Sequence, residues 1–527
     1  MRKVILMTMV LGLMIPTLVI AGGAKEQTAA TGGQSRPVVI MVHMGHTSSD
    51  EFYNRLHDYI EAQTGIQFEY RDVPNSDDYG VQLTAAIAAQ EKIDLFGTNS
   101  TELPINRSRG VIQEITDSIN NNAPNMIKLF TNPPGWPEIK SGDMWKAVTT
   151  LDGKIWAVPG ATGKDTGVVL SIRKDWREKL GFGEITTVPQ FEDYLRKVKI
   201  ADLDGNGKDD TIPFNPMYGD ASLEGIASTM VYPWVGAVGW MHEWYNAIYI
   251  SDDGKITPTI LHPNFRNFLA KMAEWYHDGL INPDVYTSTW DNDNDLLAAN
   301  RVGATASWYS DFYGAWQTLR ETVPDAEYEH AVLEGLDGSP AKFGLNNPAY
   351  ASWSYTSWAP KDIVDAGIRL QDWFCANKTN YLVQVHGIPD VDWKYVNEND
   401  MGKRPEIIHI SDQDYYSYTF VGFSAWNGVV LGDDSFRATA YRAANKLLAS
   451  KQGWFTPDWF VSYDWANTPI EKNYNDASTY INEAIANVIL GRSTLDDWDK
   501  AVKEYRNMWA NDFISGATAQ YNAALGK

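Results

Sequence analysis

Residues 37–43 read PVVIMVH, an apolar run rich in β-branched side chains that predicts a buried strand. Two further strands are predicted at residues 66–70 (IQFEY) and at residues 93–96 (IDLF). Residues 50–63 and 77–90 lie between these strands and have helical patterns. Because strand and helix alternate in short succession, we expect an α/β fold built on doubly wound, mainly parallel sheets.

The third predicted strand is followed directly by two polar side chains, Thr98 and Asn99. Ligands of open α/β sheets bind at the carboxyl ends of the strands, which makes Asn99 a candidate ligand-binding residue. Such side chains are equally suited to capping the helix that follows. Both interpretations stay open at this point.

Helices and short strands alternate through the rest of the chain without a detectable repeat. The elements that we predict are helices at residues 191–198, 265–278 and 360–377 and a strand at residues 302–306. The last fifth is strongly helical. Its apolar residues recur at helical spacing and form one stripe made of Trp498, Val502, Tyr505 and Trp509.

The N-terminus has the pattern of a secretory signal peptide, predicted at residues 1–21. A basic start precedes a nearly continuous apolar run, and Val19 and Ala21 occupy the −3 and −1 positions of a cleavage site. A membrane anchor is the alternative, but the run is short for a bilayer and contains Pro16. Residues 22–36 are polar and aperiodic, which predicts a flexible leader.

The chain contains one cysteine, Cys375, which excludes an intramolecular disulfide. No cysteine follows the apolar run, where a lipid anchor would need one. We therefore expect a protein that is exported to a periplasmic or other extracytoplasmic space and is soluble there. We also expect a monomer.

Composition bounds the architecture and the partners. The chain of 527 residues is too long for one hydrophobic core and suits two or more lobes. A net charge of −23, spread along the chain, repels nucleic acid and anionic membrane surfaces. The 21 Trp and 27 Tyr residues include flat faces that can stack on sugar rings, although most of them must serve the core.

Several ordered blocks of sequence point to a known family. These blocks are residues 151–159 (LDGKIWAVP), 167–176 (GVVLSIRKDW), 186–192 (TTVPQFE), 381–393 around His386-Gly-Ile, and 489–491 (ILG) followed by Trp498. In this order and spacing the chain resembles the extracellular solute-binding proteins of family 1, in particular their large, oligosaccharide-associated branch. The resemblance runs over most of the mature chain, with His386 in place of the usual tyrosine.

The resemblance implies a two-lobe periplasmic-binding-protein fold whose lobes are joined by several hinge crossings and close on a ligand. We expect lobe one at residues 37–162 and 353–412, and lobe two at residues 163–352 and 413–527. It also implies a binding protein and no enzyme. Such a protein carries a carbohydrate, here an oligosaccharide, to the permease subunits of an ABC importer in the membrane.

Residues 202–210 (DLDGNGKDD) place oxygen ligands at alternate positions of a tight loop, with glycine at position 6. The expected ligands are Asp202, Asp204, Asn206, Asp210 and the backbone carbonyl of Lys208. This spacing predicts a structural Ca²⁺ site. Pro213 replaces the usual glutamate at position 12, and Thr211 stands where the resembling family often has an acidic residue. A glycine-rich surface turn without metal is the alternative.

Aromatic residues that follow predicted strands or lie near the crossings are further candidates for the ligand site. They are Trp234, Trp240, Trp308, Tyr309, Trp353, Trp358 and Trp426. Trp308 is favoured because it closely follows the strand at residues 302–306. Core packing is the alternative for each of them. Arg107 and Arg109 suit either a clamp on an acidic sugar or a solvated helix face.

Sequence motifs of common catalytic sites are absent: the chain has no G-x-S-x-G, no H-E-x-x-H and no C-x-x-C. A secreted glycoside hydrolase is the main alternative function, because export, acidity and aromatic content suit it and it needs only two suitably placed carboxylates. A peptide-binding protein of the same two-lobe kind is the second alternative.

Overall fold

The structure is a computed structural model. It describes residues 33–43, 50–73, 76–100, 102–133, 139–160, 168–216, 230–236, 248–308, 312–340, 342–344, 349, 351–396, 406–411, 421–422, 426, 429–430, 452–454, 461–465 and 468–525. The predicted signal peptide lies outside these residues, as do Trp240 and Tyr309. None of the described helices is both long and apolar enough to cross a membrane.

The first sheet has five strands in the order β2-β1-β3-β12-β4. Their bounds are β1 (Val38–His43), β2 (Phe68–Val73), β3 (Leu95–Asn99), β4 (Val158–Pro159) and β12 (Ala351–Tyr355). The pairing of β1 with both β2 and β3 is parallel, which confirms the predicted α/β arrangement. β12 enters from much later in the chain and runs antiparallel between β3 and β4.

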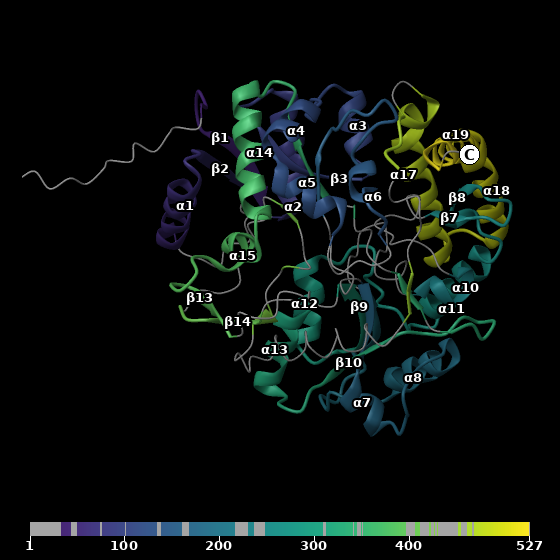
Figure 1. Cartoon of the computed structure of the whole chain (residues 1–527). Coiled ribbons are helices and arrows are strands. Elements are labelled where there is room, and N and C mark those ends of the chain that lie inside the picture. The colour runs from purple at the N-terminus through teal and green to yellow at the C-terminus, as the bar shows by residue number, and fades with distance from the viewer. Residues whose placement is uncertain are drawn as a thin grey trace, which may run out of the picture.

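Helices on both faces of this sheet bury their apolar stripes against it (Figure 1). They are α1 (Asp50–Thr64), α2 (Ser76–Ala88), α3 (Glu102–Ser108), α4 (Thr116–Asn122), α5 (Pro124–Thr131), α6 (Asp143–Lys146), α14 (Lys361–Cys375) and α15 (Lys378–His386). Leu370 and Phe374 of α14 are fully buried, in the same core as Val38 and Phe68. We call this sheet with its helices lobe one.

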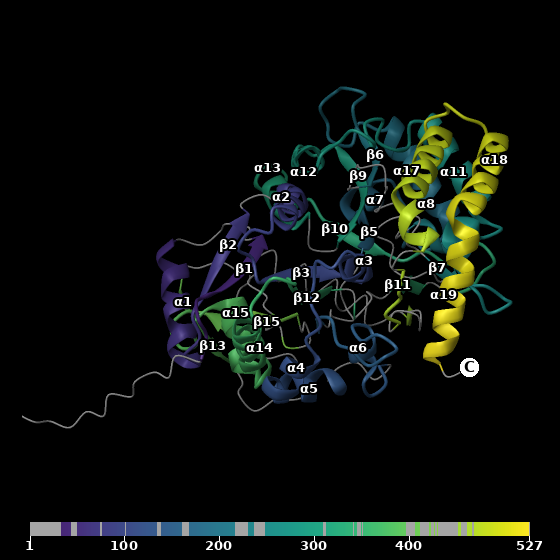
Figure 2. The same cartoon turned by 90° about the horizontal axis from the view of Figure 1, so that it is seen from above.

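The second sheet has the strand order β10-β5-β9-β6. Its strands are β5 (Val168–Arg173), β6 (Ile212–Pro216), β9 (Val302–Trp308) and β10 (Tyr328–Ala331). Only the β6–β9 pair is parallel; β5 runs antiparallel to both of its neighbours. This sheet with the helices packed on it forms lobe two, which lies beside lobe one in both views (Figure 2).

The helices of lobe two cover both faces of its sheet. They are α7 (Lys174–Lys179), α8 (Val188–Ile200), α10 (Tyr232–Val235), α11 (Phe265–His277), α12 (Trp290–Ala298), α13 (Tyr313–Thr322), α17 (Pro469–Ile489), α18 (Leu495–Tyr505), the π-helix η4 (Arg506–Ala510) and α19 (Asn511–Ala524). α8 starts at a capping box of Thr187 and Gln190, which satisfies backbone donors of its first turn. The predicted C-terminal stripe is confirmed, since Trp498, Tyr505 and Trp509 are buried in the core of lobe two.

Short strands complete the described elements. They are the hairpin of β7 (Ile248–Ile250) and β8 (Ile256–Pro258) with the 3₁₀ turn η1 (Thr259–Leu261), the pair β11 (Lys342–Gly344) and β16 (Gln452–Trp454), and the sheet of β13 (Trp393–Tyr395), β14 (Glu406–His409) and β15 (Val429–Val430). The chain passes from lobe one to lobe two between β4 and β5, and it re-enters lobe one at β12. The predicted lobe boundaries stay predictions, and Val421 and Trp426 pack against the core of lobe one.

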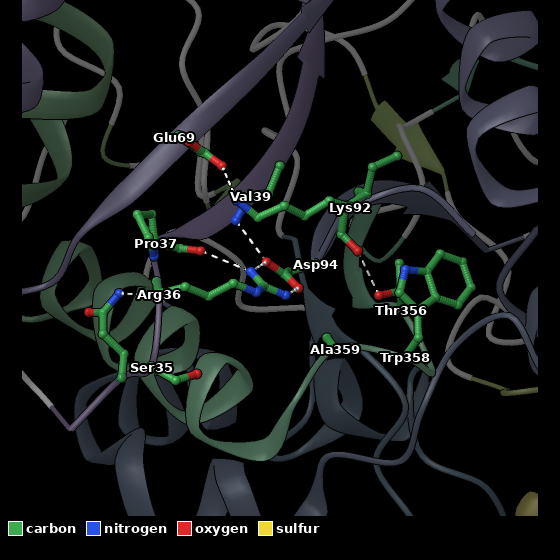
Figure 3. Close-up of polar contacts among 12 residues, drawn as sticks. Ser35, Arg36, Pro37, Val39, Glu69, Lys92, Asp94, Thr356, Trp358 and Ala359 are labelled. Atoms are coloured by element: carbon green, nitrogen blue, oxygen red, sulfur yellow. Dashed lines mark hydrogen bonds and ion pairs between the residues drawn. The ribbon is translucent and has the colours of Figure 1, made fainter. Parts of the chain in front are cut away.

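An ion pair between Arg36 and Asp94 attaches the segment before β1 to lobe one (Figure 3). Arg36 binds Asp94 with both of its terminal nitrogens, at 2.5 and 2.7 Å, and the same carboxylate accepts the N–H of Val39 at 2.8 Å. Asp94 is fully buried at the start of β3. Gln34 and Ser35 are also hydrogen-bonded to lobe one, so the chain is fixed before residue 36, where we had predicted the leader to end.

We expect Asp94→Ala to lower the free energy of unfolding of lobe one by roughly 3 kcal/mol, because the Arg36 guanidinium and the Val39 N–H lose a buried acceptor. Urea denaturation followed by circular dichroism measures this change. The control is Lys92→Ala, which removes the exposed pair with Glu69 at 2.7 Å and should cost less than about 1 kcal/mol. Equal effects of the two substitutions would contradict the assignment.

A buried histidine makes the stability of lobe one sensitive to acid. His386, at the end of α15, is 4% exposed and lies 3.0 Å from His409, measured between Nδ1 and Nε2. Burial, with a smaller contribution from His409, lowers the pKa of His386 to about 3. Between that pH and the ordinary value near 6.5, the unfolded chain binds a proton that the folded chain does not.

Stability is therefore expected to fall as the pH drops from about 6.5 towards 3, by at most ~1.4 kcal/mol for each unit of the pKa shift. His386→Gln should flatten this part of the curve, whereas His277→Gln, at a side chain that is 90% exposed, should leave it unchanged. Urea denaturation across this pH range is the measurement. Identical pH profiles for both variants would show that His386 does not carry the effect.

Candidate ligand-binding site

The carboxyl ends of three parallel strands define one edge of the sheet of lobe one. β1, β2 and β3 end there at His43, Val73 and Asn99. The antiparallel β12 starts at this edge, because Ala351 is the partner of Asn99. This is the edge at which open α/β sheets bind ligands.

Lobe two has a matching edge. Its parallel strands β6 and β9 end at Pro216 and Trp308, and Val168 at the start of β5 is the partner of Trp308. Residues 160–167 connect Pro159, at the edge of lobe one, to Val168, at the edge of lobe two. Eight linking residues allow at most about 30 Å between these two points. The ligand edges of the two lobes therefore lie at the same chain crossing.

The structure brings two of the predicted ligand residues to these edges. Trp308 is the last residue of β9, which agrees with its predicted place after a strand. Asn99 ends β3, and its Oδ1 accepts the N–H of Glu102 at 2.9 Å, so it also caps α3 as the alternative interpretation stated. The Asn99 side chain is half-buried, which leaves both roles compatible.

Other predicted ligand residues occupy different places. Trp353 is half-buried in the middle of β12, with its ring 3.9 Å from the position of a Cβ built on Gly97. Trp358 lies beyond the other end of β12, where its Nε1 donates to the carbonyl of Glu91 at 2.9 Å. Because β12 is antiparallel to β3, this is the edge opposite to Asn99, and the structure does not bring Trp358 to the candidate site.

Two further tryptophans pack into the cores. Trp234 in α10 is 7% exposed and meets Phe268 edge-to-face, with ring centroids 5.4 Å apart. Trp426 packs against the core of lobe one and meets Tyr381 edge-to-face at 5.9 Å. These contacts support the alternative interpretation for both residues, in which the tryptophan packs in the core.

The guanidinium of Arg107 links the lobes. It donates to Ser462 Oγ at 3.2 Å and to the carbonyl of Tyr463 at 2.9 Å, and it lies over the ring of Trp156. Tyr463 packs with helix α19 of lobe two, whereas Arg107 belongs to α3 of lobe one. The side chain is only 6% exposed, so it is neither the solvated helix face nor an open sugar clamp.

One exposed aromatic at the edge of lobe two was not predicted. Trp290, the first residue of α12, is 36% exposed, more than any other tryptophan whose burial the structure describes. Thr289 caps α12 by accepting the N–H of Asn292. The sequence Thr-Trp-Asp at the start of a helix does not indicate whether the tryptophan side chain is buried or exposed.

The predicted calcium loop connects α8 to β6 and turns tightly at Gly205 and Gly207, whose φ angles are +71° and +72°. The side-chain amide of Asn206 donates to Asp204 Oδ2 at 2.7 Å and to Asp210 Oδ1 at 2.9 Å. The two carboxylates are therefore bridged by one amide group. Burial raises the pKa of Asp204.

The donor set of this loop consists of oxygens, which suits a hard cation. The hydroxyl of Thr211 is buried and has no hydrogen-bond partner among the described residues. Arg301 donates to the carbonyl of Asp210 at 3.1 and 2.9 Å and brings a positive charge to the side of the loop. Within the described part of the chain, no three acidic, histidine or cysteine side chains are arranged as a ready metal site. The loop therefore contains residue types that bind calcium at the expected spacing, but their side chains are not grouped around one point in the described structure.

Comparisons with known proteins agree with this architecture. A family model described as "Bacterial extracellular solute-binding protein" matches residues 55–368. The fructooligosaccharide ABC transporter substrate-binding protein FusA of Streptococcus pneumoniae is 22% identical over 244 residues, which are 44% of this chain and 42% of that protein. The matched segment therefore spans less than half the length of this relative.

Solved structures show the same fold over nearly the whole chain. An HMO-binding, ABC-transporter-associated solute-binding protein from Bifidobacterium longum infantis has a TM-score of 0.68 at 19% identity, covering 93% of this chain and 99% of that one. The alginate-binding protein AlgQ2, solved without calcium ion, has a TM-score of 0.66 at 18% identity, covering 94% and 99%. With the family model matching more than half of the sequence, the chain belongs to the bacterial extracellular solute-binding proteins.

Proposed function

We propose that this protein is the extracytoplasmic substrate-binding component of an ABC importer and that it binds an oligosaccharide between its lobes. The observation that carries the proposal is the convergence of two ligand edges, one from each lobe, at a single chain crossing. Family membership supports it. So do the similar proteins, which are described as fructooligosaccharide-transporter and HMO-binding components.

Closure on the ligand follows from this geometry. A sugar that contacts only one edge gains contacts from one lobe, whereas a sugar that bridges Asn99 of lobe one and Trp308 of lobe two gains them from both. Ligand therefore shifts the population towards the closed state in proportion to that difference in affinity. The importer permease then recognises the closed arrangement of the lobes, and the protein itself performs no catalysis.

Aromatic faces and polar side chains at the two edges provide the recognition. We keep Asn99, Trp308, Tyr309 and Trp353 as proposed ligand residues, since each belongs to or directly follows a strand that reaches a ligand edge. Indole and phenol rings stack on the C–H faces of sugars and leave the sugar hydroxyls to polar groups such as the Asn99 amide.

We further propose that residues 202–210 bind a structural Ca²⁺. Asp202, Asp204, Asn206, Asp210 and the carbonyl of Lys208 would hold the ion, in place of the hydrogen bonds that the Asn206 amide now makes. The bound ion would neutralise the three carboxylates and fix the connection between α8 and β6. The AlgQ2 structure is described as lacking its calcium ion, so calcium is associated with a protein of this fold.

The proposed binding function predicts that one class of oligosaccharide raises the melting temperature and is recovered intact. A ligand at 100 times its Kd adds about 2.7 kcal/mol to the stability of the folded state. Thermal unfolding against neutral oligosaccharides, acidic oligosaccharides and peptides is the measurement, with chromatography of each sugar afterwards. Cleavage of the sugar would make the protein a hydrolase, and a response to peptides alone would assign it to peptide transport.

Calcium removal is expected to lower the melting temperature by several degrees, because the three carboxylates of the loop repel one another without the ion. Asp204→Asn should abolish most of the difference between unfolding in Ca²⁺ and in chelator. Asp253→Asn is the control, since Asp253 lies in an exposed turn before Gly254 and should leave the calcium response intact. A wild-type protein indifferent to chelator would make residues 202–210 a plain glycine-rich turn.

A further inference from the structure

Trp290 is a large aromatic residue that the structure leaves partly open to solvent. It is 36% exposed, whereas the other tryptophans whose burial the structure describes are buried or half-buried. A large apolar side chain gains free energy when it leaves water, by roughly 25 cal/mol for each Å² buried. The position of this residue decides whether a ligand can provide that burial.

The topology of lobe two places Trp290 at the ligand edge. α12 ends at Ala298, and only residues 299–301 connect it to the start of β9 at Val302. α12 and α13 share a core cluster with β9, in which Leu297 packs with Val302. Since helix and strand run antiparallel after so short a turn, the first turn of α12 lies on the side where β9 ends. In Figures 1 and 2, α12 lies on the side of lobe two that faces lobe one.

A buried polar contact fixes this first turn to the end of β6. Asp293 Oδ1 accepts a hydrogen bond from Asn215 Nδ2 at 3.1 Å and another from Ser288 Oγ at 2.6 Å. Asn282 in turn donates to Asn215 Oδ1 at 2.7 Å. Asp293 and Asn215 are fully buried, and Asn215 is the second-last residue of β6. This network holds the helix start within one residue of the carboxyl end of a parallel strand.

Trp290 and Asp293 are three residues apart and thus share one face of α12. Helical side chains also lean towards the N-terminus of their helix. We therefore expect the indole of Trp290 to point past the end of β6, towards the proposed ligand edge, whereas the buried Asp293 is hydrogen-bonded to Asn215. A partly exposed aromatic face in this position is suited to stacking on a sugar ring.

We propose that Trp290 is a carbohydrate-stacking residue of lobe two, positioned by the Asp293–Asn215 contact. This inference rests on the proposed function and adds a ligand contact to the same site. The alternatives are that the indole only packs against lobe one when the lobes close, or that it is an isolated surface aromatic.

Calorimetric titration of three Trp290 variants with the oligosaccharide that stabilises the wild type tests this proposal. Trp290→Ala and Trp290→Leu are expected to raise Kd at least tenfold, because both lose the aromatic face. Trp290→Phe keeps an aromatic ring and should stay within about threefold to fivefold of the wild type, since tenfold in Kd corresponds to 1.4 kcal/mol. The melting temperature of each variant without sugar is measured alongside, so that a loss of affinity is separated from a loss of folded protein.

Trp358→Ala is the matched control, since this half-buried tryptophan lies at the opposite edge of lobe one. It should leave Kd within about twofold, well under the tenfold that corresponds to 1.4 kcal/mol. An unchanged Kd for Trp290→Ala, with normal binding by the wild type, would overturn the stacking role and leave the proposed function intact. A Trp290→Leu variant that binds like the wild type would also overturn it, because any apolar side chain would then suffice. Failure of the wild type to bind any sugar would overturn both.

Discussion

The pairing of β12 with β3 determines the architecture of this protein. Five residue pairs, from Ala351–Asn99 to Tyr355–Leu95, join β3 to β12, and the first part of lobe two, from β5 to β10, lies between these strands in the chain. The sheet of lobe one therefore needs strands from both sides of that segment. Because β12 is antiparallel to β3, the return occurs at the carboxyl edge of the parallel strands. The exit after β4 and the return at β12 therefore both lie at the candidate ligand edge.

This arrangement is consistent with the proposed closure of the lobes on a ligand. Each lobe has its own large apolar core and its own sheet, so the lobes need little from each other for stability. The described contacts between them include the Arg107 side chain, with its bonds to Ser462 and Tyr463. A ligand that bridges the two edges adds contacts that neither lobe can make alone, and a modest free energy is enough to shift such a population.

Local sequence patterns predicted most of the fold. The parallel strands β1 to β3, the helices between them, β9, and the buried stripe of Trp498, Tyr505 and Trp509 all follow from short-range periodicity. Periodicity does not reveal the partner of a strand. The family resemblance predicted that the chain returns to lobe one at residue 353, but nothing local indicates that residues 351–355 pair with residues 95–99.

The candidate site was predicted less completely for the same reason. Trp308 ends a strand whose first residues are recognisable in the sequence, so it could be selected from sequence. Trp358 was selected by its aromatic side chain and lies at the opposite edge of its sheet. Trp290 was missed because its place depends on the contact between Asp293 and Asn215, which are far apart in sequence. Arg107 looked like a surface residue, and its burial depends on a segment more than half the chain away.

Small-angle X-ray scattering with and without the stabilising oligosaccharide tests the central claim most directly, because it measures the separation of the lobes. The account predicts that the radius of gyration decreases when the sugar saturates the protein and recovers when the sugar is removed by dialysis. A radius of gyration that is unchanged while calorimetry shows the sugar bound would contradict a ligand site shared between two closing lobes.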